Sequence, residues 1–417
     1  MKRFGCLIVF GLMFYFRSGV CAQQPGTAGV QQPGAAGVRQ AGAAGVQAVL
    51  MKARQGQVVL LPGFFPGKIP ELSYTKKVLS GPQFIISDDP EYIRDAECIA
   101  LREKVSPGAV RLYVYNVNGV MQPAKMPRKI TTLLKNTGKE VMHLHIEKFS
   151  SQLPGTNYFQ IGKQGLADYF QSRGIDSTFS IQPGQAAPLD PARERQVVQY
   201  DELVHGFYEF TIDQPGEVTV LQTAPDTPGP VALERIHEVV PSNHSNAGRG
   251  LFPICNYGIS MDKVIDTRDG PLTLSVADGK RDPWITGMEG STHQPVTLSG
   301  NYGVMYEIEV KWTSTDGKGL ALVTWNPWNG NSQWCGGMAN TVVVSDGKFK
   351  GGVITLPADR LITTGAPEAI LIQVFKPSGK GEAQTIKLTY SPPGASCLPT
   401  PLVFIPVEMS ADQGEAN

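Results

Sequence analysis

Hydrophobic and polar residues alternate along most of this chain, which is the pattern of β-strands that bury one face and expose the other. Between residues 58 and 223, turn residues such as Asn118 followed by Gly119 separate the alternating segments. These segments span residues 111–118, 129–134, 140–149, 206–212 and 217–223. A second series lies at residues 272–276, 296–298, 304–312, 320–325, 341–344, 352–356, 370–375, 386–390 and 402–406. The pattern therefore predicts two sets of short strands.

Helical spacing is found only in short segments. Residues 165–171 place apolar side chains three and four apart and end before Gly174, and residues 232–239 are a second candidate. We therefore predict an all-β protein made of two antiparallel β-sandwich domains in series. The domains are expected at residues 51–223 and 251–408. The Pro-, Asn- and Ser-rich residues 224–250 are the predicted linker, and residues 409–417 a disordered tail.

The N-terminal residues predict export. Lys2 and Arg3 precede an apolar run at residues 6–16, and small or compact residues follow up to Ala22, which is the arrangement of a cleaved signal peptide over residues 1–22. The mature chain is therefore expected to be secreted or associated with the cell envelope. Lipid attachment at Cys21 is the alternative, although Val20 is larger than the residue that usually precedes a lipidated cysteine.

A repetitive segment follows the predicted signal peptide. Residues 23–46 contain three imperfect octapeptides rich in Gln, Gly, Ala and Pro. These residues offer little bulk to bury, and Gly and Pro oppose both helix and strand. We therefore predict a disordered tether over residues 23–50.

Composition and charge narrow the class of partner. The chain has 37 basic and 37 acidic residues, and removing residues 1–22 leaves 34 basic against 37 acidic, a net charge of −3. Nucleic-acid binding needs clustered Lys and Arg to displace counterions, so a nucleic acid is not an expected partner. The mature sequence has no apolar run long enough for a transmembrane segment. A protein or glycan of the cell envelope is the expected partner.

Four cysteines remain after the predicted signal peptide, namely Cys98, Cys255, Cys335 and Cys397. In an oxidising compartment four cysteines can form two disulfides, and one of these would join the two halves of the chain. The alternative is a single bridge within the second half and two free thiols.

One predicted strand carries residues that can bind a metal ion. Because alternate residues of a strand point the same way, His143, His145 and Glu147 are predicted to share one face, with His205 on a later strand. Two imidazoles and a carboxylate could hold zinc, iron or manganese. The same alternation is equally expected of an exposed polar face above a buried apolar one.

A loop rich in tryptophan is the second candidate site. Trp325, Trp328 and Trp334 lie among Asn and Gln side chains in residues 325–337. Aromatic faces can cover the C–H surfaces of a sugar while amides bind its hydroxyls, so the loop predicts a carbohydrate platform. Alternatively, Trp325 and Trp334 close the end of a sandwich core, with Cys335 bridged to stiffen the loop.

Several motifs together resemble a group of exported bacterial proteins that is common in Firmicutes. They are SGPQFIISDDPEYI at 80–93, RLYVYNVNG at 111–119, GTNYFQIGKQGLADYFQSRG at 155–174, NHSNAGRGLFP at 243–253, LSGNYGVMYEIEV at 298–310 and YSPPGASCLPTPLVFIP at 390–406. Some members carry a small stalk domain named after the N-terminal domain of copper amine oxidases. The resemblance implies two envelope-associated β domains and no catalysis. In this chain the repeat tether stands where a stalk domain would be.

No nucleophile motif of the G-x-S-x-G type and no phosphate-binding loop occurs in the sequence. We therefore predict no catalytic residue and no cofactor. The leading hypothesis is a non-catalytic structural or interaction module of the cell envelope. A carbohydrate-binding module using the tryptophan loop is the alternative, and a metal-dependent enzyme at His143, His145 and Glu147 is the third.

Overall fold

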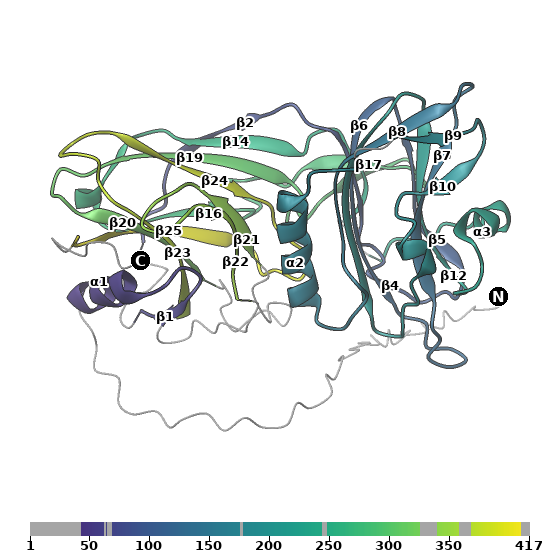
Figure 1. The fold of residues 1–417 in the computed structure, drawn as a ribbon, viewed down its shortest axis with the longest axis horizontal. Helices are drawn as coiled ribbons and strands as arrows, with labels where there is room; N and C mark the ends of the chain where they lie inside the picture. The colour runs from purple at the N-terminus through teal and green to yellow at the C-terminus, as the bar shows by residue number, and fades with distance from the viewer. Residues whose placement is uncertain are drawn as a thin grey trace, which may run out of the picture. The chain divides into compact units, whose positions relative to one another are not determined.

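The computed structural model describes residues 43–61, 64, 69–175, 178–243, 248–325, 340–357 and 368–409. Within these residues β-strands dominate, and the predicted all-β fold is confirmed (Figure 1). Most neighbouring strands are antiparallel, as the turn-separated pattern predicts. The exceptions are parallel pairs: Gln83–Ser87 (β3) and Tyr92–Ile93 (β4) lie beside Gly108–Asn118 (β6), and Asn256–Met261 (β14) and Ile265–Asp266 (β15) lie beside Met305–Thr313 (β19).

Two sheets are built mainly from the first half of the chain. The first, called the β6 sheet, has the order β18 (Gln294–Thr297), β17 (Thr286–Glu289), β13 (Arg249–Phe252), β3 (Gln83–Ser87), β6 (Gly108–Asn118), β11 (Leu203–Ile212), β8 (Met142–Ser151) and β9 (Thr178–Ile181), with β4 (Tyr92–Ile93) beside β6. The second, called the β7 sheet, has the order β10 (Ala186–Pro188), β7 (Lys129–Asn136), β12 (Gly216–Thr223) and β5 (Cys98–Val105).

The β6 sheet is buried on both faces. Leu112 and Val114 belong to a core with the inward residues of the β7 sheet, such as Leu134 and Val220. Tyr113 on the opposite face belongs to a second core, formed with helix α2 and the sheets of the second half. This double burial explains why β6 is almost continuously buried although its sequence alternates.

Two further sheets are built mainly from the second half. The β20 sheet has the order β1 (Val58–Leu60), β23 (Glu368–Phe375), β20 (Gly319–Trp325), β25 (Thr400–Val407) and β16 (Leu272–Val276). The β19 sheet has the order β2 (Tyr74–Val78), β14 (Asn256–Met261), β19 (Met305–Thr313), β24 (Gln384–Tyr390), β21 (Thr341–Val344) and β22 (Gly352–Thr355), with β15 (Ile265–Asp266) beside β19. Their shared core contains Trp312, Ile370 and Phe404.

Helix α2 (Tyr158–Gln171) confirms the helix predicted between strands, and it begins seven residues earlier than its apolar spacing indicates. Asn157 caps its first turn, accepting the Gln160 N–H at 3.2 Å. The helix contacts β8 and β11 of the β6 sheet and also β21 and β22 of the β19 sheet (Figure 1). It therefore links the two predicted halves of the chain. Short 3-10 turns also occur at Arg193–Arg195 and at Thr267–Asp269.

Strand pairing crosses the boundaries predicted at residues 224–250. From the first half, β1 pairs with β23 and β2 pairs with β14. From the second half, β13 pairs with β3, and the β17–β18 hairpin extends the same sheet beyond β13. The chain from residue 40 onward is one compact unit by its contacts. The sandwich layers therefore do not correspond to two consecutive stretches of sequence.

The end of the predicted tether forms a helix, and the predicted linker contains a helix that overlaps the candidate at residues 232–239. Helix α1 (Ala43–Lys52) includes the last eight residues of the predicted tether, because Val46 and Leu50 lie on one side of the helix and pack against the β20 sheet. Helix α3 (Gly229–Arg235) lies in the predicted linker and buries Ala232 against the β7 sheet. Among the helices of the described residues, none is long and apolar enough to cross a membrane.

Candidate functional site

Three of the four metal-ligand candidates lie where the sequence predicts. His143, His145 and Glu147 share the exposed face of β8. His143 Nδ1 is 2.6 Å from Asp213 Oδ2, and His145 Nε2 is 3.9 Å from Glu147 Oε2. The side chains of these pairs are about half exposed, so they are surface pairs of small energetic value.

The fourth candidate, His205, does not join them. Strands β8 and β11 pair so that His145 lies opposite Thr211, which places His205 six residues farther along β11, or roughly 20 Å. Burial and the charge of Arg193 lower the pKa of His205 to about 3, and Gln152 Oε1 lies 2.9 Å from its Nδ1. No group of three or more His, Cys, Asp or Glu in the described residues could hold a metal ion. The predicted four-residue site is therefore not formed.

Of the three tryptophan candidates, Trp325 lies within the described residues. Trp325 ends β20 with 3% of its surface exposed, and its ring meets Phe64 edge-on at 6.1 Å between centroids. It belongs to the core under helix α1, so it is not part of an exposed platform. Trp328 and Trp334 lie outside the described residues.

The cysteines differ from the predicted pair of disulfides. Cys98 and Cys255 are buried free thiols, so two bridges among the four cysteines are not formed. Burial raises the pKa of Cys98 to about 12 and that of Cys255 to about 11, so both thiols stay protonated at neutral pH. Cys397 is buried, and Cys335 lies outside the described residues.

An open pocket of about 750 Å³ lies where the edges of two sheets meet. Strand β5 is the edge of the β7 sheet, and the β17–β18 hairpin is the edge of the β6 sheet. The pocket opens between them and beside the segment that precedes β13. Its lining is Arg102, Glu103, Lys104, Glu217, His237, Val239, Val240, Pro241, Arg249, Leu251, Met288, Gly290, Ser291, Thr292 and His293.

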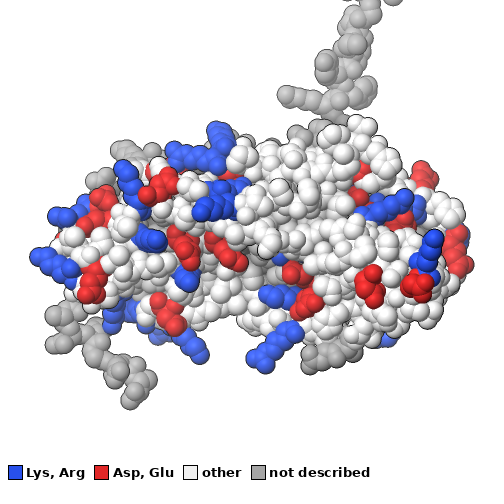
Figure 2. Space-filling view, turned by 90° about the horizontal axis from the view of Figure 1, so that it is seen from above, with Lys and Arg blue, Asp and Glu red and all other residues white. Residues whose placement is uncertain are grey.

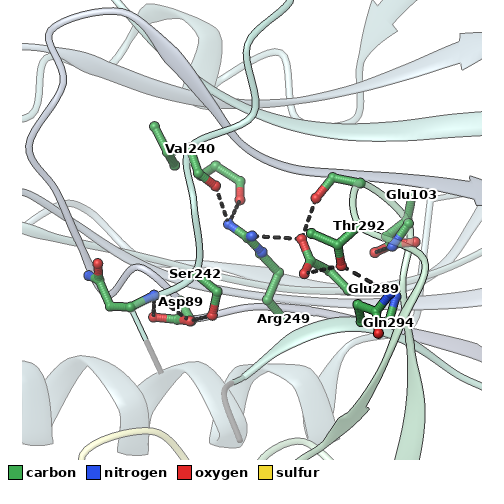
Figure 3. Close-up of polar contacts among 12 residues, drawn as sticks. Asp89, Glu103, Val240, Ser242, Arg249, Glu289, Thr292 and Gln294 are labelled. Atoms are coloured by element: carbon green, nitrogen blue, oxygen red, sulfur yellow. Dashed lines mark hydrogen bonds and ion pairs between the residues drawn. The ribbon is translucent and has the colours of Figure 1, made fainter. Parts of the chain in front are cut away.

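A buried ion pair lies at the inner side of this pocket (Figure 3). Arg249, which is 2% exposed, donates from Nη2 to Glu289 Oε1 at 2.6 Å and from Nη1 to the Val240 carbonyl at 2.7 Å. Glu289 also accepts hydrogen bonds from the hydroxyls of Thr292, at 2.8 Å, and Ser291. Burial by itself would raise the pKa of Glu289, but these hydroxyls and the Arg249 charge hold it below its ordinary value.

A second buried carboxyl group lies beside this ion pair. Glu103 points inward from β5 and accepts the Gly290 N–H at 2.8 Å. Burial, aided by the negative charge of Glu289, raises the pKa of Glu103 to about 7. Glu103 is therefore partly protonated near neutral pH. An inward charge is also a common device that protects an edge strand from pairing with another molecule.

Two neighbouring carboxyl groups with pKa values shifted apart are the pattern of a general acid and a general base. Here, however, Glu103 and Glu289 are only 3% and 6% exposed. Their oxygens are occupied by donors from Gly290, Arg249, Ser291 and Thr292. These contacts fasten the β17–β18 hairpin to β5 and β13, and we name the Arg249, Glu289 and Glu103 group the hairpin clasp.

Sequence reasoning missed the hairpin clasp for two reasons. Arg249 lies at the end of a segment that was assigned to a linker because of its Pro, Asn and Ser content. Glu103 occupies an inward position of a strand, between Leu101 and Val105, and this break in the alternation is the one local signal of its burial. The proximity of Arg249 to Glu103 depends on the pairing of β13 with β3, and no sequence pattern predicts this pairing.

The surface shows no single-sign patch on the face drawn in Figure 2, where Lys and Arg side chains lie among Asp and Glu. Large uncharged areas separate these groups. Such a face offers no continuous basic surface for a polyanion.

Comparison with known proteins adds little to the geometry. No family model and no curated protein matches the chain. Among solved structures, it is similar to the "CUB1-EGF-CUB2 domain of HUMAN MASP-1/3", with 10% sequence identity and a TM-score of 0.18, over 74% of this chain and 100% of that one. This similarity is too weak to bear on function.

Proposed function

We propose that this chain is an exported, non-catalytic interaction module of the cell envelope, and that the pocket beside the hairpin clasp receives its partner. Export is inferred from residues 1–22, and the octapeptide repeats would hold the folded part away from a surface. The observation that carries the proposal is that the charged groups inside the pocket bind one another. A site whose carboxylates and guanidinium are already engaged is suited to present a surface and has no poised reactive group.

The open part of the pocket has the character of a binding surface. Met288 is 45% exposed, and it lies beside the partly buried Leu251 on the paired strand β13. The exposed polar residues Lys104 and His293 line the same pocket. An apolar centre with a polar rim is typical of interfaces between proteins. We therefore infer that the partner is an envelope protein.

Site-specific photo-crosslinking in the producing cells tests the proposed surface. A photoreactive residue in place of Met288 should give one dominant covalent adduct with an envelope protein. The matched control is Phe179, which is 40% exposed on β9 and does not line the pocket. Equal adduct patterns from positions 288 and 179 would contradict the proposed surface.

A turnover assay tests the absence of catalysis. The purified protein should hydrolyse none of a panel of glycoside, ester and peptide substrates faster than its Glu103→Gln variant does. A rate that disappears in Glu103→Gln while the thermal melting curve keeps its cooperative shape would show that the hairpin clasp is an active site.

A further inference from the structure

Trp284 is an exposed aromatic side chain that the sequence patterns did not single out. Of the three tryptophans in the described residues, Trp312 and Trp325 are 1% and 3% exposed, whereas Trp284 is 37% exposed. It precedes β17 and lines a shallow hollow of about 330 Å³. The hollow is also lined by Lys76, Ile254, Tyr257, Arg281 and Thr286. It is distinct from the pocket at the hairpin clasp, whose lining shares none of these residues.

The loop that precedes Trp284, residues 277–283, is stabilised by side-chain hydrogen bonds and an ion pair. Asp282 is completely buried, accepts the Ala277 N–H at 2.7 Å and forms an ion pair with Lys76. This hydrogen bond stabilises Ala277 at a φ of 60°, a conformation that is costly for alanine. Asp278 Oδ1 accepts the N–H groups of Lys280 and Asp282, each at 2.9 Å. The loop therefore has a defined shape without a ligand.

One part of the indole ring packs against a glycine. A Cβ atom placed on Gly279 would lie 2.6 to 2.9 Å from three atoms of the Trp284 ring. The ring therefore lies directly against this glycine, while 37% of the Trp284 surface stays exposed and the residue lines the hollow. A large aromatic surface that is already fixed loses little conformational entropy when a ligand stacks on it.

Polar groups surround this aromatic surface at fixed positions. Lys76 Nζ lies 3.7 Å from the centroid of the Tyr257 ring, which places an ammonium group over a second aromatic side chain. Arg281 is about half exposed, and its contact with Glu71 is long, at 3.8 Å. The guanidinium is therefore able to donate hydrogen bonds to a ligand.

We propose that this hollow binds a neutral saccharide ring, with Trp284 as the stacking platform. The aromatic surface suits the C–H face of a sugar, and Lys76, Arg281 and Thr286 suit its hydroxyls. A wholly apolar ligand would make no hydrogen bonds with the exposed residues Arg281 and Thr286. The positive charges of Lys76 and Arg281 are balanced by Asp282 and Glu71, so the site does not select for an anion. The hollow is small, so it accommodates one or two rings of a chain.

Binding of neutral oligosaccharides to the full-length protein tests this assignment. Isothermal titration calorimetry with cello-, xylo-, manno- and chito-oligosaccharides should detect at least one ligand. We expect Trp284→Ala to weaken its binding at least tenfold and Trp284→Phe to retain part of it, because a smaller ring still provides a stacking face. The matched control, Phe179→Ala, removes an equally exposed aromatic side chain elsewhere and should bind like the wild type.

Three results would overturn the assignment: no neutral oligosaccharide binds, binding survives Trp284→Ala, or binding is lost only in Trp328→Ala or Trp334→Ala. Binding restricted to polygalacturonate and abolished by salt would overturn the neutral character of the ligand. The crosslinking test at position 288 is independent, because it probes a different pocket. A saccharide site can therefore exist whether or not that pocket receives a protein.

Discussion

The buried carboxyl group of Glu103 makes the stability of the folded protein depend on pH. An unfolded glutamate titrates near pH 4.5, whereas the folded pKa of Glu103 is about 7, so the folded state keeps a proton between these values. The wild-type free energy of unfolding should therefore fall as the pH rises from about 4.5 to about 7, and this contribution is constant above. His205 acts in the opposite sense below pH 6.5, because unfolding lets its buried neutral ring gain a proton.

The variant Glu103→Gln separates these two effects. Glutamine keeps an acceptor for the Gly290 N–H and carries no charge, so the variant should be more stable than the wild type above pH 7, by about 3 kcal/mol at most. The free energies of unfolding of the wild type and the variant should be similar near pH 4.5. Urea unfolding across this range measures the difference, with the exposed strand residue Glu307 replaced by glutamine as a control. A constant difference at all pH values would show that Glu103 does not titrate as described.

Gly165 provides a second test at the scale of one residue. Replacing glycine by alanine inside a helix usually stabilises a protein by about 1 kcal/mol. Here the new Cβ would lie 2.1 Å from His205 Cε1, inside the packed contact between α2 and β11. We expect Gly165→Ala to lower the free energy of unfolding by about 1 to 3 kcal/mol, as overpacking does. Urea midpoints check this, and the exposed Gln160→Ala in the same helix is the control.

At the scale of elements, the hairpin clasp decides how β17 and β18 are attached. Removing Glu289 leaves the Arg249 guanidinium buried without its charged partner, and such a change typically costs about 3 to 5 kcal/mol. Glu289→Ala should therefore destabilise the protein strongly and increase hydrogen exchange first in the β17–β18 hairpin. The exposed pair of Lys387 and Glu309 is a suitable control, since Glu309→Ala should change stability by less than about 1 kcal/mol. Similar losses of stability in Glu289→Ala and Glu309→Ala would contradict a stabilising role for the hairpin clasp.

Helix α1 is the other element whose role can be measured. Burying Val46 and Leu50 contributes about 1.5 to 3 kcal/mol for each side chain. A chain that begins at residue 43 should be as stable as one that begins at residue 23, whereas a chain that begins at residue 53 should lose about 3 kcal/mol or more. Thermal melting compares the three, and dye binding would report the exposed face of the β20 sheet. Equal stability of all three would mean that α1 acts only as part of the tether.

At the scale of the whole molecule, the exchange of strands determines how the chain folds. Residues 51–223 and 251–408 produced separately should not fold, because each fragment would lack strands that complete its sheets. The two fragments produced together should form a soluble complex. Circular dichroism and size-exclusion chromatography check both outcomes. Cooperative unfolding of either fragment alone would instead support independent domains.

The sequence by itself determined the local features of this protein. Alternating polarity identified β6, β7, β8, β11, β12, β16 and β18 to β25, but it did not single out strands such as β2, β3, β5, β13 and β17. Residue spacing identified the end of α2, and the helix candidate at residues 232–239 overlaps α3. It also placed His143, His145 and Glu147 on one strand face. These predictions succeed because period and turn chemistry are properties of neighbouring residues. Such patterns cannot reveal which strands pair, because partners such as Val58 on β1 and Ile370 on β23 are far apart in the sequence.

Only the tertiary structure decided the long-range features. It paired β13 with β17, which joins Arg249 to Glu289, and it paired β13 with β3, which brings that ion pair beside Glu103. It buried Trp325 and left Trp284 exposed, although both are tryptophans near a strand end. It also separated His205 from the other histidines along β11. Burial and electrostatic environment depend on these long-range contacts, so the candidate sites followed from the fold and not from the order of residues.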